Sequence, residues 1–251
     1  MKELFLQPQT PGQDTREYTY QMIRQNLLEL TLPPHTQLSE AMVAQLLDVS
    51  RTPVHDAFAR LDEEGLMCAV PQKGTLVAPI SANRVEQGVF MKVQLGRAVL
   101  EKICKEGLRE EAFFSLESNI NRQYFCLGAE NYRELAALGA AFHRALYESA
   151  GLCDVWQALS VSCADLVRVQ ALSPFQELYR TIVSEHADLF SAVRRKNAEQ
   201  AVMLMERHYL HALDYLSVAR QQMPAYFDGA YAAQAQPWAF SAERHNFFDS
   251  L

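Results

Sequence analysis

The chain has 251 residues and a mass of 28.5 kDa, enough for one large domain or two ordinary ones. Its net charge of −7 argues against a protein that coats nucleic acid through bulk positive charge, although a local basic face is compatible with it. Hydrophobic residues make up 49% and charged residues 21%, which is typical of a globular protein and excludes collagen, disulfide scaffolds and long disordered regions. No apolar run approaches the about 18 residues of a membrane span, and the first residues lack a secretory signal. We therefore expect a cytoplasmic protein that makes no contact with a membrane.

The chain carries five cysteines, an odd number, and none of them lies in a CxxC pair. This usage favours buried thiols in a reducing cytosol. A redox pair between Cys153 and Cys163 is the alternative, and nothing else in the sequence supports it.

The N-terminal part predicts a flexible arm followed by three helices. Residues 1–14 are polar and carry Pro and Gly, as loose termini do. From Arg16 to Leu30 apolar residues recur at helical spacing, and Pro33 and Pro34 cannot continue that helix. Two more helices are expected, one from about Ser39 to Leu47 and one that Ser50 caps and Gly65 ends.

The pattern changes after the third helix. Two short extended runs, 66–70 and 75–79, flank a turn with the sequence PQKG, which is typical of a β-hairpin. Helix, helix, turn, helix and hairpin together are the layout of a winged helix-turn-helix, which we place over residues 15–80.

Residues 81–220 show only helical periodicity, interrupted at a few Gly, Pro and Asn positions. We expect an all-helical antiparallel bundle of about six helices, so the fold class is mainly α. The predicted helices are 82–106, 109–127, 131–150, 152–172, 175–195 and 197–220.

The extension over 221–251 is rich in Ala, Gln and aromatic residues and has weak periodicity. Its aromatic side chains are too many for a free tail, so we expect it to pack on the bundle or on a second subunit. They are Tyr226, Phe227, Tyr231, Trp238, Phe240, Phe247 and Phe248.

The third helix carries the candidate DNA-reading residues. A helix-turn-helix places the first turn of its third helix against base edges and phosphates in the major groove. Arg51 can contact guanine through two hydrogen bonds, and the hydroxyls beside it suit phosphates or bases. The candidates are Ser50, Arg51, Thr52 and His55 on this helix, and Gln72, Lys73 and Gly74 at the hairpin tip. Residues 1–80 contain six Lys and Arg against ten Asp and Glu, a net charge of −4, so only a few placed groups can attract DNA.

Residues 38–81 resemble the winged-helix domain of the GntR superfamily of transcription regulators. The run VSRTPV at 49–54, with Arg60-Leu61, Gly65-Leu66 and Gly74, matches the family pattern. The helical remainder is similar to the FadR-type branch, which carries an FCD domain. The resemblance implies a regulator of metabolic genes, commonly a repressor, that binds a two-fold double-stranded DNA operator as a homodimer.

One departure from the family pattern falls on the recognition helix. The family usually has Arg-Glu where this chain has His55-Asp56. Histidine carries less charge at pH 7 and lacks the planar fork of arginine, so we expect a different operator preference or affinity.

Three histidines lie on the apolar stripes of three different predicted helices: His143, His186 and His208. Imidazole is the commonest neutral metal ligand, which makes these residues a candidate site for Zn²⁺ or Ni²⁺. The resemblance supports this, because FCD domains hold a divalent metal with an Asp-x3-His, a Glu-His and a later His. The Asp position is Gly139 here, so one carboxylate ligand is missing, while His211 falls on another face and is expected to be solvated.

The resemblance also implies a small effector bound inside the bundle, and the loss of an anionic ligand favours a carboxylate or a sugar acid. The family usually has an arginine at the position of Gln94, with Arg97 one turn later. Gln94, Arg97 and Arg168 are therefore weak effector-binding candidates.

Two other functions are alternatives to a regulator. One is a metal-dependent hydrolase with an accessory winged helix, and the other is an interaction module that does not bind DNA. No nucleophile elbow, P-loop, dinucleotide fingerprint or HExxH motif occurs, and a regulator accounts for both halves of the chain. We therefore expect that the protein is not an enzyme and has no catalytic residues.

Overall fold

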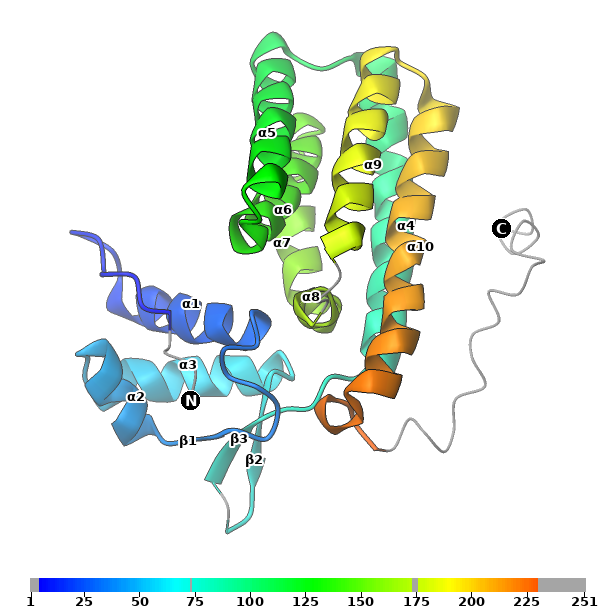
Figure 1. The fold of residues 1–251 in the computed structure, drawn as a ribbon. Helices are drawn as coiled ribbons and strands as arrows, with labels where there is room; N and C mark the ends of the chain where they lie inside the picture. Colours follow the sequence, from blue (N-terminus) through cyan, green and yellow to red (C-terminus); the bar gives the residue numbers. More distant parts are fainter. Residues whose placement is uncertain (1–4, 73, 173–175, 230–251) are drawn as a thin grey trace.

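The computed structural model of the protein describes residues 5–72, 74–172 and 176–229. This part of the chain is mainly helical and has one small sheet of three strands, so the expected fold class is confirmed. Figure 1 shows an N-terminal lobe, with three helices and the sheet, beside a lobe built from helices alone. None of the described helices is long and apolar enough to cross a membrane.

The N-terminal lobe is a winged helix-turn-helix. Its three helices pack around side chains of the predicted apolar stripes, of which Leu27, Val54 and Leu61 are fully buried. Asp48 adopts the left-handed backbone conformation, with φ of 53°, and so makes the turn between the second and third helices tight. The helices are α1 (Thr15–Leu28), α2 (Glu40–Leu47) and α3 (Arg51–Glu63).

Side-chain caps define the starts of the first two helices but not of the third. The Asp14 carboxylate accepts the backbone N–H of Arg16, and the Ser39 hydroxyl accepts that of Met42. Ser50 is the N-cap residue of α3, yet its side chain accepts no capping hydrogen bond. The predicted position of Ser50 at the N-cap is therefore confirmed, whereas the capping hydrogen bond of its hydroxyl is not formed.

The sheet contains the predicted hairpin and one strand that was not expected. Its strand order is β1-β3-β2 and both pairings are antiparallel. The unexpected strand has two residues, too few for an alternating pattern, and pairs Gln37 with Leu76. The strands are β1 (Gln37–Leu38), β2 (Met67–Val70) and β3 (Gly74–Val77), and the hairpin projects from the lobe in Figure 1.

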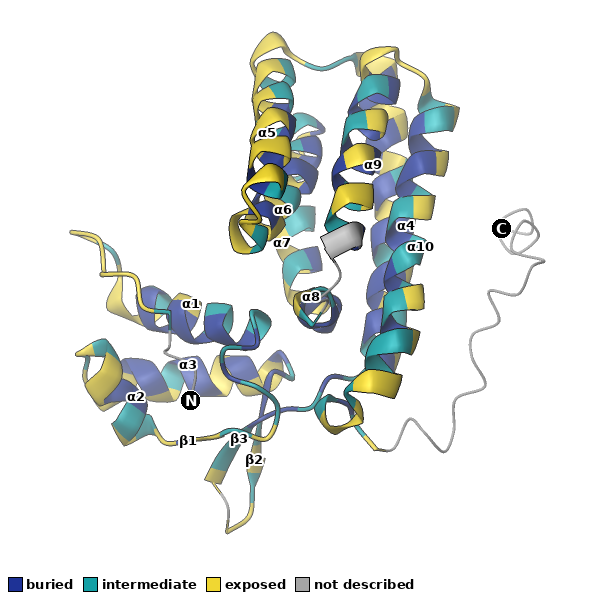
Figure 2. Ribbon diagram, viewed as in Figure 1, coloured by how far each residue is buried: buried dark blue, intermediate teal, exposed yellow. Residues whose placement is uncertain are grey.

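The helical lobe follows the predicted boundaries closely, with one exception. The helix expected over 152–172 is two helices, because the chain bends at Cys163, whose thiol packs against Gly88 of the first bundle helix. Figure 2 shows the buried residues on the faces that the helices turn toward each other. The helices are α4 (Ala82–Glu106), α5 (Glu110–Gly128), α6 (Tyr132–Ser149), α7 (Cys153–Ser162), α8 (Ala164–Ala171), α9 (Gln176–Arg194) and α10 (Ala198–Gln222).

Both ends of the described chain are attached to the lobes. Near the N-terminus, the backbone of Phe5 exchanges two hydrogen bonds with the Asn26 side chain of α1. After α10, a short 3-10 helix (Pro224–Tyr226) leads to a bridge between Phe227 and Ile80, which lies two residues before the start of α4. The other aromatic residues of the expected C-terminal extension, beyond residue 229, lie outside the described residues.

A buried ionic network joins the two lobes. Arg168 of α8 is fully buried; it bonds the Asp165 carboxylate at 2.9 Å and donates to the carbonyl oxygen of Ala78 at 2.6 Å. Asp165 also accepts the backbone N–H of Ser81, and Arg84 lies 3.5 Å from it. The segment that leaves the wing is therefore bound to α8.

Candidate nucleic-acid interface and metal centre

The predicted recognition face of α3 is open to solvent. Ser50, Arg51, Thr52 and His55 are all exposed, while the opposite side of the helix carries the buried Val54 stripe. The first turn of α3 therefore presents one guanidinium, one imidazole and two hydroxyls on an accessible surface, which are groups that can reach phosphates and base edges.

His55 has a carboxylate beside it. Its Nδ1 lies 2.8 Å from Oε1 of Glu40, the first residue of α2, and its side chain is 70% exposed. The hydrogen bond to Glu40 and the charge of that carboxylate raise the pKa of His55 above its usual value. The imidazole that replaces the family's arginine is thus biased toward its cationic form, although Glu40 brings a negative charge to the same surface.

The wing tip is exposed as expected. Gln72 and Gly74 both have positive φ, 65° and 81°, which folds the hairpin into a tight turn. Lys73, the one expected cation of the wing, lies outside the described residues.

The three histidines meet inside the helical lobe. His143 comes from α6, His186 from α9 and His208 from α10. Nε2 of His143 lies 3.1 Å from Nε2 of His208 and 3.2 Å from Nε2 of His186. Zinc–nitrogen bonds of about 2.0–2.1 Å would place adjacent ligand nitrogens roughly 3.0–3.4 Å apart. Both of these distances fit ligands of one metal ion, and the candidate ligand atoms of the three histidines all lie within 4.8 Å of one another.

Two of the histidines form hydrogen bonds through Nδ1, the ring nitrogen that faces away from the cluster, and these bonds orient Nε2 as a metal ligand. Nδ1 of His186 lies 2.7 Å from Oε1 of Gln123, and Nδ1 of His208 lies 3.0 Å from Oε2 of Glu185. Both acceptors place the proton on Nδ1, so both Nε2 lone pairs point at the centre of the cluster. Without a metal, a proton on Nε2 of His143 can be shared with these two nitrogens; a divalent metal can take the place of that proton, so the donor set fits one.

Burial favours the neutral form of two of the three rings. It holds the pKa of both His143 and His186 well below the usual range, and the charges of neighbouring histidines add to the effect. Burial alone would raise the pKa of Glu185, but its hydrogen bond to His208 and the charges of His208, His211 and Arg207 lower it overall. An ionised Glu185 that accepts a hydrogen bond from Nδ1 of His208 strengthens that ring as a metal ligand.

His211, expected to be solvated, is only partly exposed. Its Nε2 lies 3.0 Å from Oε1 of Glu185, so it shares this carboxylate with His208. Glu185 and His211 also line a surface pocket of about 460 Å³. In the sequence, the feature that points to Glu185 as part of this site is its position directly before His186.

Gly139 occupies the position where the family resemblance expects a carboxylate ligand. A Cβ atom added to Gly139 would lie 3.4 Å from Cε1 of His186. This backbone position therefore lies at the edge of the histidine cluster, but glycine has no side chain that could act as a metal ligand.

The expected effector-binding residues take different positions. Arg97 forms an ion pair with Glu206 at 2.5 Å and lines a surface pocket of about 430 Å³. Arg168 belongs to the network between the lobes, so a structural role replaces the effector contact expected of it. The Nε2 atom of Gln94 is buried without a hydrogen-bond partner among the described residues, and its role stays a prediction.

Sequence reasoning overlooked two residues beside the histidine cluster. Gln123 holds His186, and nothing in the periodicity of its helix distinguishes it from a surface glutamine. Lys92 is buried. The sequence feature that could have revealed it is the presence of a charged residue on the apolar stripe of α4, three positions after Val89.

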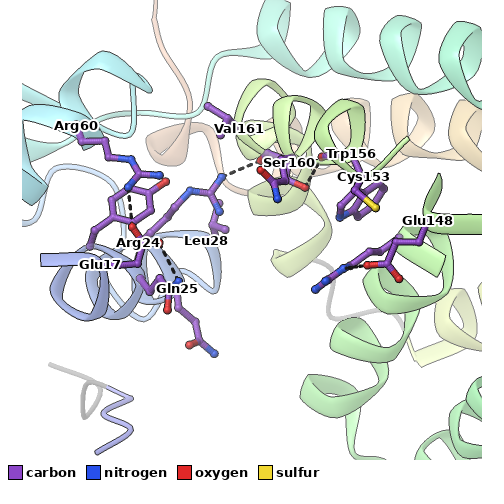
Figure 3. A pocket seen from close by; sticks show the side chains of 14 residues that line it. Glu17, Arg24, Gln25, Leu28, Arg60, Glu148, Cys153, Trp156, Ser160 and Val161 are labelled. Carbon is purple, nitrogen blue, oxygen red and sulfur yellow. Dashed lines mark hydrogen bonds and ion pairs between the residues drawn. The ribbon is translucent and has the colours of Figure 1, made fainter. Parts of the chain in front are cut away.

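A cleft separates the recognition lobe from the bundle (Figure 3). It has a volume of about 590 Å³ and is lined by residues of α1, α3, α6 and α7. Arg24 of α1 donates to the Ser160 carbonyl of α7 at 2.7 Å and to the Glu64 carboxylate at 2.8 Å. This arginine therefore connects α1, the end of α3 and the sensor helices, beside the ionic network of Arg168.

An exposed recognition helix with a wing, joined to a helical lobe that contains a buried histidine cluster, defines a DNA-binding protein with a second, all-helical domain. The comparisons with known proteins agree. The family model described as "Bacterial regulatory proteins, gntR family" matches residues 15–77, and the "FCD domain" model matches residues 94–211. The chain belongs to the GntR family of transcription regulators and carries the FCD type of C-terminal domain.

Relatives of the chain match it over most of both lengths. The "HTH-type transcriptional repressor RspR" of Escherichia coli K12 is 26% identical over 219 residues, which cover 86% of this chain and 95% of the relative. An uncharacterized regulator of Streptomyces ambofaciens is 28% identical over 222 residues, covering 87% and 92%.

Solved structures share the fold. Escherichia coli McbR/YncC aligns with a TM-score of 0.71 at 16% identity, covering 84% of this chain and 99% of that one. A putative GntR regulator from Rhodococcus sp. RHA1 gives a TM-score of 0.68 at 19% identity, covering 81% and 98%. The matched families and relatives are transcription regulators and not enzymes, which removes the hydrolase alternative.

Proposed function

We propose that the protein is a homodimeric, cytoplasmic repressor of metabolic genes, released from its operator by a small carboxylate or sugar acid. The observation that carries the proposal is the junction between the lobes. The histidine cluster lies in the same bundle whose α7 and α8 are bonded to α1 and to the segment that leaves the wing. A ligand that repacks the bundle can therefore move the recognition helix. By linkage, DNA and effector must then weaken each other's binding.

We assign DNA contacts to both parts of the winged helix. Arg51 reads a base through its guanidinium, while Ser50, Thr52 and the His55–Glu40 pair position the helix on phosphates and bases. Gln72, Lys73 and Gly74 extend the contact from the wing. Since residues 1–80 sum to −4, two copies of this face are needed for tight binding, which favours a dimer.

We assign the metal to His143, His186 and His208, with Zn²⁺ or Ni²⁺ as the ion. A bound metal would supply a Lewis acid that accepts a carboxylate oxygen of the effector at an open coordination position. The residues of this chain hold the ion through neutral imidazoles, and Glu185 and Gln123 fix two of those rings.

DNA retardation tests the proposed operator contacts. A fragment of the protein's own promoter is titrated with wild type, Arg51→Ala and Arg109→Ala, an exposed arginine at the start of α5. Arg51→Ala should weaken specific binding about 5- to 150-fold, since one base-reading arginine contributes about 1–3 kcal/mol. Equal affinity of all three proteins would contradict the assignment.

A thermal-shift screen tests the sensor. Small carboxylates and sugar acids are added with and without Zn²⁺ or Ni²⁺, and any acid that raises the melting temperature is then added to the protein–DNA complex. An effector should release the DNA. A stabilising acid that leaves the complex intact would show that binding and regulation are not coupled.

A further inference from the structure

A lysine is buried inside the helical lobe, next to the histidine cluster. Lys92 comes from the inner face of α4 and is only 8% exposed. Its Nζ lies 5.1 Å from the ring centroid of Tyr209 on α10 and 5.4 Å from the ring centroid of Trp156 on α7. The ammonium group thus faces aromatic rings from two other helices, which stabilise it in part through cation–π attraction.

This lysine has no acidic partner. In the described part of the chain, no carboxylate forms an ion pair with Lys92, and its electrostatic neighbours are the Cys163 thiol and the His143 ring. A charged group taken out of water destabilises a protein unless an opposite charge and hydrogen bonds compensate it. A metal at the nearby histidines would add further positive charge, so an anion would stabilise this region.

Two more buried polar atoms without a partner gather at the same rings. The Tyr147 hydroxyl and Nδ1 of His143 have no hydrogen-bond partner among the described residues. The Tyr147 ring centroid lies 5.4 Å from that of Trp156, and the His143 ring centroid lies 5.1 Å from that of Tyr209. Trp156 and Tyr209, whose rings face Lys92, therefore also neighbour the residues that carry these two unpartnered atoms, Tyr147 and His143.

We propose that Lys92 and Tyr147 bind the carboxylate of a small organic acid, whose carbon skeleton lies against Trp156 and Tyr209. This inference rests on the proposed function of the helical lobe as a sensor and names its anion-binding residues. An ammonium and a hydroxyl can donate to the two oxygens of one carboxylate, while the rings form apolar walls. The ligand is thus anionic at one end, and an uncharged sugar or amide of the same shape is rejected.

The position of Trp156 connects this site to the DNA-binding lobe. The Trp156 side chain lines the cleft between the lobes, and the backbone carbonyl of Trp156 accepts the Ser160 hydroxyl at 2.9 Å (Figure 3). Ser160 in turn accepts a hydrogen bond from Arg24 of α1. An acid seated at Lys92 therefore contacts the helix that holds α1.

Trp156 fluorescence provides the test. The chain has two tryptophans, so Trp238→Phe leaves Trp156 as the reporter. Metal-free and Zn²⁺-loaded protein are titrated with acetate, succinate and gluconate, and with acetamide, succinamide and sorbitol as uncharged counterparts. We expect a saturable signal from at least one acid and none from its counterpart.

Variants of two lysines on the same helix decide the assignment. Lys92→Met, which keeps the volume of the stem, should weaken the acid at least about tenfold, because a hydrogen bond to a charged group is lost. Lys92→Arg should recover most of that loss, and Lys102→Met, an exposed lysine of α4, should change nothing. Circular dichroism melting checks that each variant is folded.

The inference is overturned if no acid gives a saturable signal in wild type, or if Lys92→Met binds the acid as tightly as wild type does. Promoter retardation with the same wild-type protein is read separately. DNA binding without acid binding would refute the site at Lys92, whereas acid binding without DNA binding would refute the proposed regulator and leave the site standing.

Discussion

The buried ion pair within α8, at the junction of the two lobes, should cost far more stability when one partner is removed than when both are removed. Asp165→Asn keeps the shape of the side chain but takes away the charge that faces the fully buried Arg168. The variant then holds a guanidinium 0% exposed, with only carbonyl oxygens such as that of Ala78 as partners. We expect Asp165→Asn to lower the free energy of unfolding by about 3–5 kcal/mol.

The double variant Asp165→Asn/Arg168→Met removes both charges and should recover a large part of that loss, because no unpaired ion is left in the interior. Urea unfolding followed by far-ultraviolet circular dichroism gives the four free energies of the cycle. Arg144→Met is the control, since Arg144 pairs with Glu148 at 2.6 Å on the surface and should cost only about 0.3–0.5 kcal/mol. Strictly additive losses for Asp165 and Arg168 would refute the reasoning.

Three further predictions concern the metal and the DNA face. His186→Ala should lower the amount of metal bound and the melting temperature of the metal-loaded protein. Metal analysis and thermal melting check this. The site would be contradicted if wild type contains no metal ion and the variant melts at the same temperature as wild type. Gly139→Asp should tighten metal binding at least about tenfold by adding a fourth ligand, measured by competition with a chelating dye, and unchanged affinity would show that this position does not reach the ion. Because Glu40 raises the pKa of His55, the imidazole is protonated as pH falls through that raised value, so DNA binding should tighten from pH 8 to pH 6. Over the same pH range, the slope of the logarithm of the binding constant against the logarithm of the salt concentration should become steeper by about 0.9. His55→Gln should abolish the pH dependence of both the affinity and this slope.

Much of the fold follows from periodicity alone. The helix predicted over 82–106 is α4 with the same bounds, because a long apolar stripe and a terminal Gly107 mark it clearly. The bend at Cys163 was not predictable, since it depends on the contact with Gly88, which is distant in sequence. The strand β1 has two residues and exists only through its pairing with β3.

The sequence predicts the three histidine ligands of the candidate metal site but not the residues that surround them. Spacing placed His143, His186 and His208 on inner faces, and the structure brings them together. Gln123 and Lys92 were overlooked, because their importance comes from which helices pack against theirs. Arg168 was assigned to the effector for its charge, whereas its actual partners come from α8 and from the end of the wing.

The bridge between Ile80 and Phe227 makes the helical lobe a closed module. The backbone N–H of Ile80 donates to Tyr226 at 2.9 Å, and that of Asp228 donates back to Ile80 at 3.1 Å. The sensor therefore begins and ends at one point, as inserted domains do. Exchange of this lobe between related regulators should succeed when both cuts, near 80 and after 228, are made together. A cut at 211, where the matched FCD domain ends, would fall inside α10 and leave Ile80 without its bridge partner Phe227.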